Sequence, residues 1–131
     1  MEVDLLIYTI LLLIMYFLSG IKKINTFDST VNSFSKKAHI DLERWMYEFI
    51  IFCVIVLEIF VPAFIVYNIY MNNYNYWMFY GVIALIFFTI LATFVYHYPP
   101  EGSAYYAFMA NVTATGGLFL LSYIIYNKIN A

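Results

Sequence analysis

Four long apolar stretches, separated by short polar connections, constrain this chain more than any other feature of its sequence. They cover residues 5–21, 47–67, 76–98 and 103–126. Each is close to the roughly 17–25 residues that a helix needs to cross the hydrocarbon core of a bilayer. Lipid tolerates only helices or closed barrels, and no alternating strand pattern is present. We therefore expect an all-α polytopic membrane protein, with one four-helix transmembrane domain over residues 1–131.

The composition excludes the main alternatives to a membrane protein. Of the 131 residues, 65% are hydrophobic and only 11% are charged. A soluble domain is nearer half apolar, with about a quarter of its residues charged. A globule of this size has too little interior to bury so much apolar surface. No basic patch is present, so we expect no nucleic-acid partner, and the lipid bilayer becomes the first expected partner.

The connection over residues 22–44 predicts the topology. Phe27, Val31 and Phe34 recur in it at spacings of four and three, which indicates a short amphipathic helix in this first loop, on the membrane surface. Five of the six basic residues lie in the same connection: Lys22, Lys23, Lys36, Lys37 and Arg44. Cytosolic loops carry an excess of Lys and Arg. We therefore expect this loop to be cytosolic and both termini to lie on the non-cytosolic side.

Glu58 is the clearest polar anomaly, because it lies near the middle of the second apolar stretch. A charged side chain there costs about 2.5–3.5 kcal/mol on insertion scales. Glu48 is ten residues away, about 15 Å along a helix, so the two acids do not form a paired catalytic site. Asn111 and Thr115 of the last stretch are expected at a similar depth, and we expect one of them to donate a hydrogen bond to Glu58.

This candidate polar site has two interpretations. It either fixes how the second and fourth spanning helices pack, which we favour, or it forms a pocket for a proton, a quinone-like molecule or a lipid headgroup. A stripe of small residues in the last stretch predicts close helix packing, since its members recur at spacings of four and three. The stripe consists of Ser103, Ala107, Ala110, Ala114 and Gly117.

No residues have the spacing of a catalytic or metal site. His97 at the end of an apolar stretch and His39 in a connection do not make a ligand set. No nucleophile triad, phosphate loop or nucleotide fingerprint is present. We therefore expect no catalytic residues, no bound metal and no cofactor of the chain's own, with a quinone or lipid as the ligands to consider. An enzymatic role is the less favoured expectation.

Two short motifs and the internal acid resemble the DoxX-like family of small four-helix membrane proteins. The first motif is FLSGIKK over residues 17–23, similar to the family's G-x-x-K pattern, and the second is NVTATGGLFLL over residues 111–121. The residues that match family positions are Gly20, Lys23, Glu58, Asn111, Gly116 and Gly117. None of them is an established catalytic residue in the family.

The resemblance implies two functions. The family is similar to the small subunit of an archaeal thiosulfate:quinone oxidoreductase, to bacterial membrane components linked to oxidative stress and sulfur metabolism and, more distantly, to surfeit-locus cargo receptors.

The excess of Ile, Asn, Tyr and Phe implies an A/T-rich genome, which is compatible with a large DNA virus with an internal membrane, or with a host organelle. We expect a non-enzymatic structural or assembly component that packs with other membrane or capsid-type proteins. The alternative is the membrane subunit of a quinone-linked oxidoreductase.

Overall fold

Four long apolar helices account for the predicted spans. The computed structural model describes residues 3–38, 40–96, 101–102 and 104–131, and within them it contains helices and no strand. The helices are α1 (Val3–Asn25), α2 (Phe27–Lys37), α3 (Arg44–Tyr70), α4 (Tyr76–Tyr96) and α5 (Ala104–Ile129). By length and composition α1, α3, α4 and α5 can each cross a membrane. The predicted all-α membrane fold is confirmed, and the helices extend past several of the expected ends.

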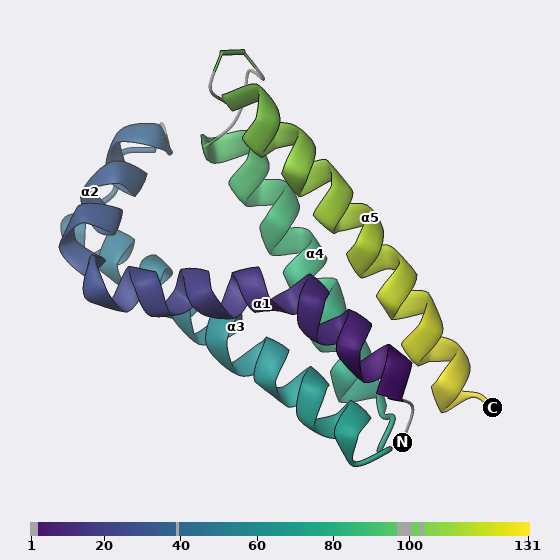
Figure 1. The fold of residues 1–131 in the computed structure, drawn as a ribbon. Coiled ribbons are helices and arrows are strands. Elements are labelled where there is room, and N and C mark those ends of the chain that lie inside the picture. The colour runs from purple at the N-terminus through teal and green to yellow at the C-terminus, as the bar shows by residue number, and fades with distance from the viewer. Residues whose placement is uncertain (1–2, 39, 97–100, 103) are drawn as a thin grey trace.

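The spanning helices are arranged as two antiparallel pairs. Helix α1 lies against α3 and α4 lies against α5, with smaller contacts between α3 and α4 and between α1 and α5. The two pairs converge at the end that holds the start of α1, the end of α5 and the α3–α4 connection, and they diverge toward the end that holds α2 (Figure 1). The start of α1 and the end of α5 therefore lie at the same end of the bundle, opposite the basic connection. Which end faces the cytosol remains a prediction.

The apolar core lies at the converging end, where all four spanning helices contribute. Its buried members come from α1, α3, α4 and the second half of α5. They are Leu13, Ile65, Ile69, Met78, Val82, Leu85, Ile86, Leu118, Leu121 and Ile125. Large apolar side chains elsewhere on the spanning helices are exposed, as expected for surfaces that face lipid. The first half of α5 therefore packs less tightly than its second half.

Helix α2 is the predicted amphipathic segment, and its apolar stripe is covered by protein. Val31 is fully buried, and Phe27 and Phe34 pack beside it against the first turns of α3. Phe34 also stacks on Tyr96 of α4, with 6.5 Å between ring centroids. The expected helix is confirmed, and its apolar stripe packs against α3 and α4. Its place on the membrane surface stays a prediction.

The α3–α4 connection is held by asparagines. Asn68 is 3% exposed, and its Oδ1 accepts hydrogen bonds from Nδ2 of Asn73 and of Asn75, each at 3.2 Å. In the connection before α5, Gly102 has φ 59°, a conformation that favours glycine. Pro99 and Pro100 of the same connection lie outside the described residues.

Candidate polar site between α1 and α3

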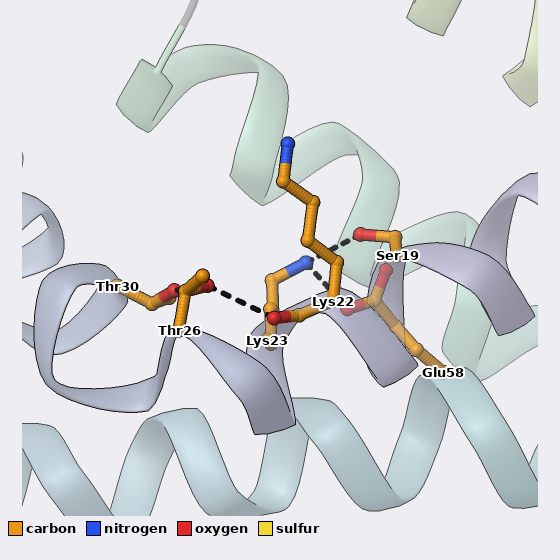
Figure 2. A network of polar contacts seen from close by, with 6 residues as sticks. All are labelled: Ser19, Lys22, Lys23, Thr26, Thr30 and Glu58. Atoms are coloured by element: carbon orange, nitrogen blue, oxygen red, sulfur yellow. Dashed lines mark hydrogen bonds and ion pairs between the residues drawn. The ribbon is translucent and has the colours of Figure 1, made fainter.

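Glu58 has a basic partner inside the spanning bundle. Its side chain is 3% exposed, and its Oε1 lies 2.7 Å from Nζ of Lys23 on α1. The same Nζ donates a hydrogen bond to Oγ of Ser19 at 2.6 Å (Figure 2). A buried charge is tolerated when it is paired and hydrogen-bonded, and both conditions are met here. The acid that breaks the apolar pattern of α3 is therefore neutralised by the neighbouring helix.

Gly20 explains why α1 approaches α3 closely at this point. A Cβ atom at Gly20 would lie 2.6 Å from Cγ1 of Ile59 and 3.2 Å from Cβ of Glu58. Any larger side chain would therefore push the two helices apart. Lys23 is three residues further along the same face of α1, so its Nζ reaches Glu58 across this contact. Glycine and lysine at this spacing act together, one allowing the approach and the other supplying the charge.

The position of Lys23 depends on where α1 ends. The helix continues to Asn25, beyond the expected end at Ile21, and the next turn is held by a hydrogen bond from Oγ1 of Thr26 to the carbonyl oxygen of Lys22 at 2.9 Å. Lys22 points away from the ion pair, while Lys23 points toward it (Figure 2). Of the two adjacent lysines, Lys23 is therefore part of the ion pair with Glu58 and Lys22 is not.

The structure does not bring Asn111 or Thr115 to Glu58. Oγ1 of Thr115 instead donates to the carbonyl oxygen of Asn111 in its own helix at 2.8 Å. The reason is the pairing of the helices: α3 lies against α1, whereas α5 lies against α4. Lipid-facing helices are apolar on every side, so hydropathy carried no information on this pairing. The predicted hydrogen bond from Asn111 or Thr115 to Glu58 is therefore wrong, and the partner of Glu58 is Lys23.

The small-residue stripe of α5 is only partly covered. A Cβ atom at Gly117 would lie 3.0 Å from Cδ1 of Leu12 on α1, so the Leu12 side chain packs against Gly117. Ala107 and Ala114 are half-buried, and Ala110 is exposed. Ser103 lies outside the described residues. The stripe is therefore uncovered at Ala110.

A second polar contact joins the two helix pairs. The hydroxyl of Tyr16 on α1 lies 2.6 Å from Oγ1 of Thr89 on α4. Thr89 uses its own hydrogen to donate to the carbonyl oxygen of Leu85 at 2.7 Å, so Tyr16 is the donor. This bond lies one turn of α1 before Ser19 and Gly20. It ties α4 to the helix that carries Lys23.

We expect Tyr16→Phe to lower the free energy of unfolding only slightly, by about 0.6 kcal/mol, the average for an interhelical hydrogen bond in a membrane protein. Thr89 keeps its bond to Leu85, so the change leaves no buried donor unpaired. Unfolding of the reconstituted protein by a denaturing detergent measures the difference, with Tyr8→Phe, at an exposed position of the same helix, as the matched control. A loss of several kcal/mol for Tyr16→Phe alone would contradict this assignment.

No metal centre is found in the described part of the chain, where no three His, Cys, Asp or Glu side chains come together. His39 and His97 lie outside the described residues.

The fold and the site define a helical membrane protein with four spans and an internal Lys–Glu pair. The DoxX family model matches residues 5–98, more than two thirds of the chain, and the protein belongs to the DoxX family. This match includes Gly20, Lys23 and Glu58 but ends before the second motif, residues 111–121, so the resemblance of that motif stays a prediction. No curated protein and no solved structure gives a significant match to this chain.

Proposed function

We propose that this protein is a non-enzymatic structural component of a larger membrane assembly. The observation that carries the proposal is the Lys23–Glu58 ion pair. Both charges are engaged in the contact between α1 and α3, and Glu58 is 3% exposed. A carboxylate that is buried and paired in this way stabilises helix packing and is shielded from a substrate in the lipid phase. The polar site therefore supports a rigid α1–α3 pair.

The alternative, a membrane subunit of a quinone-linked oxidoreductase, has weaker support. It needs a lipid-accessible opening at Glu58 and Asn111. A groove of about 160 Å³ between α4 and α5 is lined by Thr115, but neither Glu58 nor Asn111 lines it. Its volume is below the roughly 300–1,000 Å³ of ordinary small-molecule sites. In native membranes, Glu58→Gln that leaves the assembly intact but abolishes electron transfer would establish this alternative and overturn the structural role.

The open part of the α5 stripe is the surface that we propose for a partner helix. Ala110 is exposed on it, and only the second half of α5 is buried in the core. Small residues at this spacing let a second backbone approach within van der Waals contact. In the proposed topology the connection over residues 22–44 is cytosolic. The membrane is either that of a cellular compartment or the internal membrane of a large DNA virus.

We expect Ala110→Leu to remove the protein from its assembly without unfolding it, since the added side chain projects from an exposed position. Extraction of native membranes in a mild detergent, followed by native gel electrophoresis and mass spectrometry, measures the size and the members of the assembly. The matched control is Ala84→Leu, the same change at an exposed position of α4. The control is expected to stay in the large species, whereas Ala110→Leu shifts to the mass of the single chain.

Two results would contradict the proposal. One is a wild-type chain that migrates alone in native membrane extracts, and the other is Ala110→Leu that stays in the same assembly as wild type. The identity of the partners also tests the proposed membrane. Capsid-type proteins among them support the virion membrane, and redox subunits support the alternative function.

A further inference from the structure

The α1–α3 pair carries an apolar groove whose lining includes neither Lys23 nor Glu58. The groove encloses about 550 Å³. This volume is within the range of roughly 300–1,000 Å³ that small-molecule sites occupy. Its walls are apolar side chains from the end of α1, the start of α2 and the middle of α3. They are Ile24, Phe27, Phe52, Ile55, Val56, Ile59 and Phe60.

The positions of the groove residues along α3 place the groove within the hydrocarbon core. Along α3, Phe52 and Phe60 are eight and sixteen residues beyond Arg44, the first residue of the helix. At 1.5 Å per residue these positions lie about 12 Å and about 24 Å from Arg44. One leaflet of the hydrocarbon core is about 15 Å thick, half of the whole. The groove therefore crosses the bilayer midplane, with its near end in the leaflet that begins at Arg44.

A charged cluster lies at the interfacial end of this groove. Arg44 donates from Nε to Oε1 of Glu48 at 3.1 Å and from Nη1 to Oδ1 of Asn32 at 2.6 Å, while Oδ1 of Asp28 is 3.8 Å from its Nη2. Asp28 directly follows the groove residue Phe27, and Glu48 is one helical turn before Phe52.

The charges of this cluster do not balance. Two carboxylates share one guanidinium, which leaves a net charge of about −1 at neutral pH. Asp28 is 88% exposed, and its 3.8 Å distance from Arg44 is too long for a hydrogen bond. Its oxygens therefore remain available to a further donor. Within the basic connection over residues 22–44, this cluster is a locally negative surface, and it is electrostatically complementary to a cation that approaches along the membrane interface.

We propose that the groove and the Asp28–Arg44–Glu48 cluster bind a phospholipid with a primary ammonium headgroup, of the phosphatidylethanolamine class. The acyl chain occupies the groove, and the ammonium donates hydrogen bonds to the carboxylates of Asp28 and Glu48. Charge-assisted bonds of this kind are stronger than neutral ones. Choline has no N–H to donate, and an anionic headgroup meets the excess negative charge. The site therefore selects among lipids by headgroup and not by chain alone.

The test uses the whole protein, reconstituted in vesicles with equal amounts of phosphatidylethanolamine, phosphatidylglycerol and phosphatidylcholine. After extraction in a mild detergent, mass spectrometry identifies the lipid that stays bound. We expect phosphatidylethanolamine to exceed phosphatidylglycerol by about fivefold, the effect of one unit charge near the membrane surface. Equal retention of the three lipids would mean annular lipid only and would overturn the proposal.

Three variants separate the charge from the groove. Glu48→Lys changes the cluster from about −1 to about +1 and is expected to reverse the preference toward phosphatidylglycerol, a gain that unfolding would not produce. Val56→Trp fills the groove and is expected to lower the retention of every lipid. Asp41→Asn is the matched control, because Asp41 is exposed and outside the cluster, and it is expected to bind as wild type. A Glu48→Lys variant that still prefers phosphatidylethanolamine would overturn the assignment.

Discussion

Replacing Lys23 by Met is expected to lower the free energy of unfolding by about 3 kcal/mol, the lower end of the range for breaking a buried ion pair. The loss arises because Glu58, only 3% exposed, would keep a buried carboxylate without its cation. The lower end applies because the Lys23 side chain is 23% exposed. Reversible unfolding of the reconstituted protein in a denaturing detergent, followed by circular dichroism, measures the change.

Lys22→Met is the matched control for this prediction. Lys22 is adjacent in sequence, is exposed and points away from Glu58 (Figure 2). Lys22→Met removes the same charge from the same end of α1 as Lys23→Met does. Because Lys22 is not part of the ion pair, we expect this substitution to change the free energy of unfolding by no more than about 0.5 kcal/mol. Equal losses for Lys22→Met and Lys23→Met would mean that the membrane interface, and not Glu58, holds Lys23.

Gly20→Ala is expected to destabilise the protein by about 1–3 kcal/mol, the usual cost of overpacking a well-packed contact. The new Cβ would lie 2.6 Å from Cγ1 of Ile59, which can move away only by a χ1 rotation that a helix disfavours for isoleucine. Helices α1 and α3 would have to separate, which also lengthens the distance from Lys23 Nζ to Glu58 Oε1. Detergent unfolding measures the loss.

Gly116→Ala is the control, because no atom lies within 4 Å of a Cβ at Gly116. Alanine favours a helix over glycine by about 1 kcal/mol, so this change should be neutral or stabilising. Shortening the opposing side chain by Ile59→Ala should recover part of the stability lost in Gly20→Ala. If Gly20→Ala is as stable as wild type, the close approach of α1 to α3 at Gly20 is wrong.

The sequence predicts the spans well and their pairing poorly, for one physical reason. Hydropathy reports whether a segment can enter lipid, and α1, α3, α4 and α5 all satisfy that condition. In a soluble bundle the apolar face of a helix shows where its neighbour lies. In a bilayer the outer face is apolar too, so the choice of α1 and not α5 as the neighbour of α3 depends on a few positions such as Gly20.

Only one member of the ion pair, Glu58, can be predicted from the sequence. Glu58 is identified because a charged side chain in the middle of a spanning helix raises the free energy of membrane insertion. Hydropathy does not identify Lys23 as its partner, because the apolar stretch ends at Ile21 and places Lys23 in the basic connection, whereas α1 continues to Asn25. The usable signal was the spacing of Gly20 and Lys23, which puts a small residue and a cation on one face of α1. Asn111 and Thr115 were expected there from depth alone, and depth does not determine which helices touch.

The most direct test of the Lys23–Glu58 ion pair is its coupling free energy, measured by a double-mutant cycle. The cycle compares unfolding of wild type, Lys23→Met, Glu58→Leu and the double variant. We expect the double variant to be more stable than the sum of the single losses implies, with a coupling of about 2 kcal/mol, within the range for residues in contact. Losses that add within about 0.5 kcal/mol would show that Lys23 and Glu58 do not interact.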